Sequence, residues 1–134
     1  MLAHRWTALV TILAVLTYFW MSLRVGQARG KTGIAAPAMT GDPLLERTIR
    51  VHYNTLEWLP IFLAGLWLFA IYWNELVAAA LGVVWIVGRV IYAQGYVAEA
   101  SRRAPGFFIQ LAATAILLFG AAGKIIYGLA TGSA

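Results

Sequence analysis

Four long apolar stretches fill most of this 134-residue chain and limit what it can fold into. A helix needs about 20 consecutive apolar residues to cross a bilayer, and we expect spans over about 5–28, 44–73, 76–100 and 106–130. Inside lipid each backbone amide must bond within its own segment, which favours helices for all four. The sequence therefore predicts an all-α integral membrane protein, a single four-transmembrane-helix domain over residues 1–134.

Composition excludes several classes of protein. With 62% hydrophobic and 11% charged residues, and a mean hydropathy of +0.78, the chain differs from a soluble domain. It has no cysteine, so it has no disulfide and no thiolate nucleophile, and its two histidines, His4 and His52, lie far apart. We therefore expect no metal site. The basic residues are not interleaved with aromatics as in nucleic-acid-binding patches, so we expect them to meet membrane lipids or a small anionic ligand.

Basic residues gather at one end of the predicted bundle. The loop over 29–43 carries Arg29 and Lys31, and the turn between the last two spans carries Arg102 and Arg103. Loops rich in lysine and arginine generally remain in the cytoplasm. We therefore expect this end to be cytoplasmic, in a bacterial inner membrane or the endoplasmic reticulum, and both termini to lie on the other side.

Two polar stripes interrupt the second and third spans, where lipid disfavours charge. Arg50, Asn54 and Glu57 share one face of the second span because they are four and three residues apart. The second stripe, spaced i, i+3, i+7 and i+14 on one predicted face of the third span, consists of Arg89, Tyr92, Tyr96 and Arg103. Counting outward from the turn between these spans puts both stripes at the same depth, in the cytoplasmic half of the bilayer. Ionisable residues at such a depth indicate a functional site.

The stripes combine several arginines with one carboxylate, one amide and two phenols. Arginine binds carboxylates through two parallel hydrogen bonds, and Glu57 could hold an ammonium group. A small zwitterion with excess negative charge, such as glutathione, fits this set, although composition alone does not select it over other anionic peptides or lipids. In the alternative interpretation, Glu57 and Arg89 pair across the hairpin, which still leaves Arg50 and Arg103 uncommitted.

Both stripes belong to longer motifs. The first is Glu46-Arg47-x-x-Arg50-x-His52-x-Asn54-x-x-Glu57-x-x-Pro60. The second is Gly88-Arg89-x-x-Tyr92-x-x-Gly95-Tyr96, followed by Arg103-Ala104-Pro105-Gly106. Together they resemble the signatures of the MAPEG family, the membrane-associated proteins in eicosanoid and glutathione metabolism. The resemblance covers essentially the whole chain and is greatest to the microsomal glutathione transferase 2 and leukotriene C4 synthase branch.

This resemblance implies a homotrimer in which glutathione, the co-substrate, binds between adjacent subunits with its thiol at the membrane. It implies that Arg103 is catalytic and stabilises the thiolate, and that Arg29 reaches glutathione from the neighbouring subunit. His52 stands where family members often have a glutamine that faces that neighbour. Trp58 replaces a tyrosine, and Gly30 replaces a second arginine of the leukotriene-forming members, which favours a general transferase. With Arg89 added from the second stripe, the expected glutathione-binding residues are Arg29, Arg50, His52, Asn54, Glu57, Trp58, Arg89, Tyr92 and Tyr96.

We therefore expect a membrane-bound glutathione transferase that activates the glutathione thiol for attack on lipophilic electrophiles, with glutathione peroxidase activity on lipid hydroperoxides as an additional activity. One alternative is a non-enzymatic lipid-binding and lipid-presenting protein of the same fold, which the joint presence of Arg50, Glu57 and Arg103 disfavours. Another is a small multidrug transporter with four spans, which the lack of a carboxylate in the first span disfavours.

Overall fold

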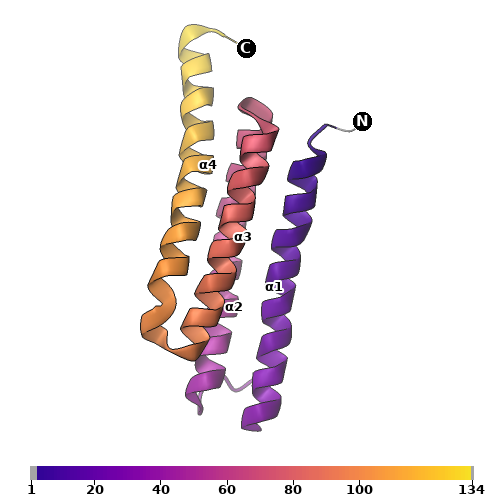
Figure 1. Cartoon of the computed structure of the whole chain (residues 1–134), viewed down its shortest axis with the longest axis vertical. Coiled ribbons are helices and arrows are strands. Elements are labelled where there is room, and N and C mark those ends of the chain that lie inside the picture. Colours follow the sequence, from indigo (N-terminus) through magenta and orange to yellow (C-terminus); the bar gives the residue numbers. More distant parts are fainter. Residues whose placement is uncertain (1–2, 134) are drawn as a thin grey trace.

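The computed structural model describes residues 3–133, which form four long helices and no strand (Figure 1). The helices are α1 (Arg5–Thr32), α2 (Pro43–Tyr72), α3 (Glu75–Ala98) and α4 (Ala104–Thr131), and a 3₁₀ turn, η1 (Ala100–Arg103), precedes α4. All four helices are long and apolar enough to cross a membrane. The expectation of an all-α chain with four such helices is confirmed.

The four helices run alternately up and down, so that the two ends of the chain lie at the same end of the bundle (Figure 1). The connection over 33–42 and the turn η1 lie together at the opposite end, and both carry or adjoin basic residues. Helices α2 and α3 each contact all the other helices, while α1 and α4 flank that pair. The basic end of the bundle is thus formed by one end of each of the four helices.

Polar side chains fix where α2 and α3 begin. The Asp42 carboxylate accepts a hydrogen bond from the Leu44 amide at 2.8 Å, and the Asn74 side-chain oxygen accepts one from the Val77 amide at 3.0 Å. Each of these caps satisfies one of the amides that the first turn of a helix leaves without a partner. Helix α2 ends at Tyr72 and α3 begins at Glu75, so only two residues connect these helices.

The first helix is capped by a residue far away in the sequence. His4, which precedes α1, makes no side-chain capping bond. Instead a carboxylate oxygen of Glu75, in the first turn of α3, accepts hydrogen bonds from the amides of Trp6 at 2.9 Å and Thr7 at 3.4 Å. A carboxylate at a helix N-terminus also interacts favourably with the helix dipole. Glu75 thus ties α1 to the turn between α2 and α3.

Glycines allow α3 and α4 to approach closely beside the basic end. A Cβ atom added at Gly106 would lie 2.6 Å from the Gly88 carbonyl oxygen and also against the backbone of Tyr92. One added at Gly95 would lie 2.5 Å from the Arg102 carbonyl oxygen. Because only hydrogen fits at these positions, the start of α4 packs directly on the α3 segment that carries Tyr92.

Candidate functional site

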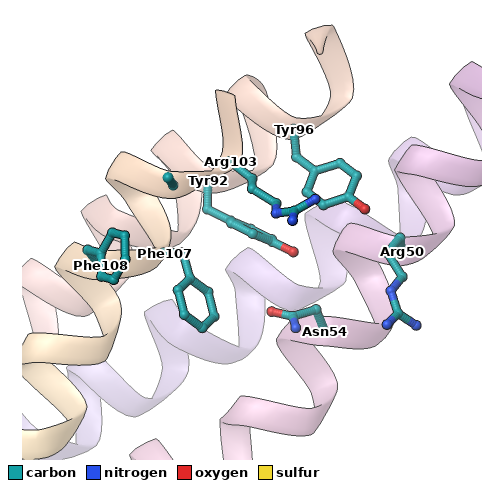
Figure 2. Close-up of a pocket in the computed structure, with 8 residues that line it drawn as sticks. Arg50, Asn54, Tyr92, Tyr96, Arg103, Phe107 and Phe108 are labelled. Atoms are coloured by element: carbon teal, nitrogen blue, oxygen red, sulfur yellow. The ribbon is translucent and has the colours of Figure 1, made fainter. Parts of the chain in front are cut away.

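A pocket of about 440 Å³ lies between α2, α3 and the start of α4, close to the basic end (Figure 2). Half of the residues that the sequence predicted for the site line it. The lining comprises Arg50 and Asn54 from α2, Tyr92 and Tyr96 from α3, Arg103 from η1, and Ala104, Phe107 and Phe108 from α4. The two tyrosine hydroxyls and the Arg103 guanidinium point toward the side where Arg50 and Asn54 project from α2 (Figure 2).

Arg103 reaches the pocket by a route that the sequence did not predict. Helix α3 ends at Ala98, Glu99 is extended with φ −160°, and the chain reverses through η1. The expectation that Arg103 continues the helical face of Tyr92 and Tyr96 is therefore wrong. The reversal nevertheless brings the Arg103 guanidinium carbon to 5.7 Å from the centre of the Tyr96 ring.

The preceding arginine lies in a different environment. Arg102 pairs with Glu99 at 3.2 Å, and both side chains are mostly exposed. Arg102 does not line the pocket, although it is adjacent to Arg103 in the sequence. The two arginines of η1 therefore differ in environment: Arg103 lines the pocket, and Arg102 lies on the surface of the protein.

Aromatic rings form the inner wall. Tyr92 is only 2% exposed, and its ring meets that of Tyr96 edge-on, with centres 5.6 Å apart. Phe107 lies 6.2 Å from the Tyr92 ring, and Trp58 packs edge-on against Phe107 at 5.7 Å. Trp58 therefore supports the wall from behind and does not line the pocket of this chain.

Arg89 lies beneath the pocket and does not line it. Its side chain is fully buried, and its Nη1 donates a hydrogen bond to the Asn54 side-chain oxygen at 2.8 Å and a longer one to the Thr55 hydroxyl at 3.4 Å. Within residues 3–133 the one ion pair formed is the pair between Glu99 and Arg102. The alternative in which Glu57 neutralises Arg89 is therefore not realised in this structure.

Glu57 is exposed and lies outside the pocket wall. Thr55, two residues earlier, is fully buried, and two residues on a helix correspond to a rotation of roughly 200°. Glu57 consequently faces away from the bundle, and Arg50 is exposed on the same side. The predicted stripe on α2 lies on one face, but only its inner edge borders the pocket.

Arg29 and His52 also lie away from the pocket of their own chain. The Arg29 Nη1 donates to the carbonyl oxygens of Ala38 at 2.7 Å and Ile34 at 3.3 Å, so it holds the loop that follows α1. The His52 ring stacks on Tyr18 of α1, with centres 4.7 Å apart and an angle of 5° between the planes. Within one chain, each has a structural role in positioning α1 and its loop.

The aromatic contribution of α4 was not predicted from the sequence. The predicted fourth span begins at residue 106, whereas α4 begins at Ala104 with Pro105 in its first turn. Phe107 then lies one helical turn beyond Arg103, and it enters the same pocket. The four-residue spacing between Arg103 and Phe107 was the signal that could have identified this wall.

The polar side chains lining the pocket either only donate hydrogen bonds or can both donate and accept them. Two guanidinium groups, one carboxamide and two phenols line it, without a carboxylate among the lining side chains that the structure describes. In residues 3–133 no three His, Cys, Asp or Glu side chains gather closely enough to hold a metal ion. The arginine, amide and phenol groups that line the pocket favour anionic ligands. Arginine is suited to carboxylates because of its planar fork of donors.

Comparison with known proteins places this arrangement in a family. The model of the MAPEG family matches residues 7–123. This chain belongs to the MAPEG family. The match includes both motifs and every residue that lines the pocket, so the resemblance identified from the sequence is confirmed. With its four long apolar helices, this MAPEG member is a multi-pass membrane protein.

Three relatives of this MAPEG chain align with most of its length. An uncharacterized protein of Synechocystis is 48% identical over 124 residues, covering 92% of this chain and 90% of its own. Microsomal glutathione S-transferase 2 of Homo sapiens is 41% identical over 117 residues, covering 87% and 80% respectively. Leukotriene C4 synthase of Bos taurus is 41% identical over 96 residues, covering 72% and 64%. The branch of the MAPEG family predicted from the motifs is thereby confirmed.

Proposed function

We propose that this protein is a membrane-bound glutathione transferase that activates the glutathione thiol for attack on lipophilic electrophiles. The observation that carries the proposal is the convergence of two arginines, an amide and two tyrosines on one pocket beside an apolar wall. Relatives named as a glutathione transferase and as leukotriene C4 synthase support it. The closely related Synechocystis protein has no assigned activity.

The donor set fits glutathione as a ligand. Glutathione carries two carboxylates and one amine, so it brings a net negative charge that the pocket arginines can balance. Arg50 and Arg103 come from different elements, and the Asn54 amide and the tyrosine hydroxyls lie on the same pocket. Separate donors can therefore bind separate acidic groups of one extended peptide.

Thiol activation is the role we assign to Arg103. A free thiol has a pKa of about 8.5 and is mostly protonated near neutral pH. A guanidinium nearby, in a medium of low dielectric constant, favours the thiolate and so lowers the thiol pKa. The Tyr92 and Tyr96 hydroxyls lie beside Arg103 and can donate hydrogen bonds to the sulfur.

The transfer step needs a bound thiol and an apolar second substrate. Glutathione supplies the sulfur, whose proton passes to water and whose electron pair forms the new C–S bond while the leaving group departs with its own pair. Phe107 and Phe108 give the pocket an apolar wall, and Phe108 is 63% exposed on the surface of this chain. An electrophile dissolved in the bilayer can therefore approach along this wall.

A peroxidase activity is the second reaction that we propose for the same thiolate. Attack of the sulfur on a lipid hydroperoxide breaks the O–O bond, and a second glutathione completes the reaction. The hydroperoxide is reduced to an alcohol and water, and two glutathione molecules are oxidised to the disulfide.

The proposal is tested by incubating the purified protein in detergent with glutathione and a chlorinated aromatic compound, and measuring the conjugate. We expect a rate above the uncatalysed background that saturates with glutathione. Glutathione binding without conjugate, or binding of lipid without binding of glutathione, would instead indicate the non-enzymatic lipid-presenting protein of the same fold. A hydroperoxide in place of the aromatic compound tests the second reaction.

We also propose that the protein assembles as a homotrimer in which a neighbour covers the outer side of the pocket. Arg50 and Glu57 are exposed on α2 at positions within a predicted span. An ionisable side chain exposed to lipid within a membrane span is costly. A second copy of the chain would shield both residues, and it would bring its own Arg29 or His52 to this side.

Replacing Glu57 by Gln should weaken glutathione binding by about 1.5–3 kcal/mol, because the ligand amine would lose its charge-assisted bond to the Glu57 carboxylate. The measurement is the dissociation constant of glutathione in the assembled protein. Glu99→Gln is the matched control, since Glu99 is exposed, pairs with Arg102 and lies at the same end of the bundle. An unchanged dissociation constant for Glu57→Gln would remove Glu57 from the binding site.

Single cysteines should report the orientation, because the natural chain has none. We propose that the basic end and its pocket face the cytoplasm. A cysteine at Thr40, in the exposed loop after α1, should then react with a membrane-impermeant maleimide only after permeabilisation. A cysteine at Ser133 should react in intact cells. The opposite labelling pattern would reverse the orientation.

A further inference from the structure

Arg89 carries a charge that nothing in its surroundings balances. The side chain is 0% exposed, and no carboxylate among the described residues lies within ion-pair distance. Its Nη1 is hydrogen-bonded, whereas its Nε and Nη2 have no partner within residues 3–133. A buried charge without a counter-charge is costly. Its position therefore needs an explanation beyond packing.

The contact with Asn54 gives that explanation. A guanidinium has only donors, so the Asn54 atom that it binds at 2.8 Å must be the amide oxygen. With the oxygen occupied, the amide nitrogen and its two hydrogens are left for the pocket, which Asn54 borders. Without Arg89 the amide could turn over and present its oxygen, which would repel an anion.

Neighbouring groups hold Arg89 in this position. The guanidinium carbon lies 4.9 Å from the Tyr92 ring and 5.5 Å from the Trp85 ring, so the cation lies against two aromatic rings. The Thr55 hydroxyl donates to the Val51 carbonyl at 2.9 Å and accepts the longer bond from Arg89. Helix α3 thus delivers one fixed donor to the inner side of α2.

We infer that Arg89 is a positioning residue that orients the Asn54 amide so that its NH₂ group binds a carboxylate of glutathione. This inference rests on the proposed function and deepens it, because it assigns the pocket's anion preference to a side chain that does not touch the ligand. It also differs from the sequence-based expectation that Arg89 itself contacts glutathione.

A double-mutant cycle tests the inference through the dissociation constant of glutathione. We expect Arg89→Met and Asn54→Ala each to raise it roughly tenfold, and the double variant to bind no more weakly than either single variant. Coupling of this kind shows that Arg89 acts through Asn54. If the two factors multiply to about a hundredfold, the residues act independently and the inference is overturned.

Two further variants separate positioning from general damage to the fold. Arg89→Lys keeps a donor for the Asn54 oxygen and should retain most of the affinity. Asn54→Asp should unfold at an equal or higher temperature, because the new carboxylate pairs with Arg89, yet it should bind glutathione more weakly than Asn54→Ala does. Tight binding by Asn54→Asp would contradict the assigned orientation.

Gln110→Met is the control for loss of a buried polar group. Gln110 is also fully buried and accepts a hydrogen bond from the Trp85 indole at 3.1 Å, but it does not border the pocket. We expect a lower unfolding temperature with an unchanged dissociation constant. Equal weakening by Gln110→Met and Arg89→Met would overturn the inference, whereas absence of glutathione binding to the natural protein would overturn the proposed function together with it.

Discussion

Arg103→Ala should lower the turnover number by about a hundredfold or more while leaving most of the glutathione affinity in place. Removing one group that stabilises developing or fixed negative charge in an active site costs about 10²–10³ in rate. Affinity should persist because Arg50 and Asn54 remain on the other side of the pocket. The measurements are the steady-state rate and the ultraviolet absorbance of bound thiolate as a function of pH, which should shift to higher pH in the variant.

The neighbouring arginine supplies the control. Arg102 lies in the same 3₁₀ turn but forms an exposed ion pair with Glu99, and such surface pairs contribute about 0–1 kcal/mol. Arg102→Ala should therefore be nearly silent in both measurements. Arg103→Lys should retain part of the activity, because a point charge remains although the planar fork is lost. A thiolate titration that moves in Arg102→Ala and not in Arg103→Ala would transfer the role to Arg102.

Gly106→Ala should destabilise the protein by about 3 kcal/mol or more, at the upper end of the usual cost of overpacking. The added methyl group would meet the Gly88 carbonyl oxygen at 2.6 Å and the backbone of Tyr92. Backbone atoms cannot move aside by changing a rotamer, so α3 and α4 would have to separate. Since Tyr92, Arg103 and Phe107 line the pocket on either side of this contact, we also expect the glutathione-dependent activity to fall.

Gly123→Ala, on the same helix, tests whether the effect is specific. No atom lies within 4 Å of a Cβ added at Gly123, so the change should be neutral or should stabilise α4 by about 0.5–1 kcal/mol. The unfolding temperature of both variants in the same detergent decides the matter. A Gly106→Ala protein as stable as Gly123→Ala would show that α3 and α4 do not depend on this close approach.

The helices were predictable because apolar length is a local property of the sequence. The same holds for Arg50 and Asn54, whose four-residue spacing places them on one face of α2. Periodicity says which residues share a face, but not which way that face points. It therefore did not reveal that Glu57 faces away from the bundle, since that orientation follows from the burial of Thr55 against other helices.

Burial of charge was the other property that the sequence could not reveal. Arg89 belongs to the same motif as Tyr92, yet one lies under the pocket and the other lines it. The distinction depends on Asn54, thirty-five positions earlier in the chain, which accepts the hydrogen bond of Arg89. Similarly, Arg103 reaches the pocket through a chain reversal that a continuous helical pattern does not anticipate.

The capping of α1 by Glu75 determines the order in which parts of the chain can reach their final contacts during synthesis. Helix α1 is synthesised first, but the carboxylate that accepts its opening amides belongs to a residue made after the whole of α2. The amides at the start of α1 therefore lack this carboxylate acceptor until α2 has been inserted and Glu75 has been synthesised after it. Only then does the start of the polypeptide become fastened to its middle.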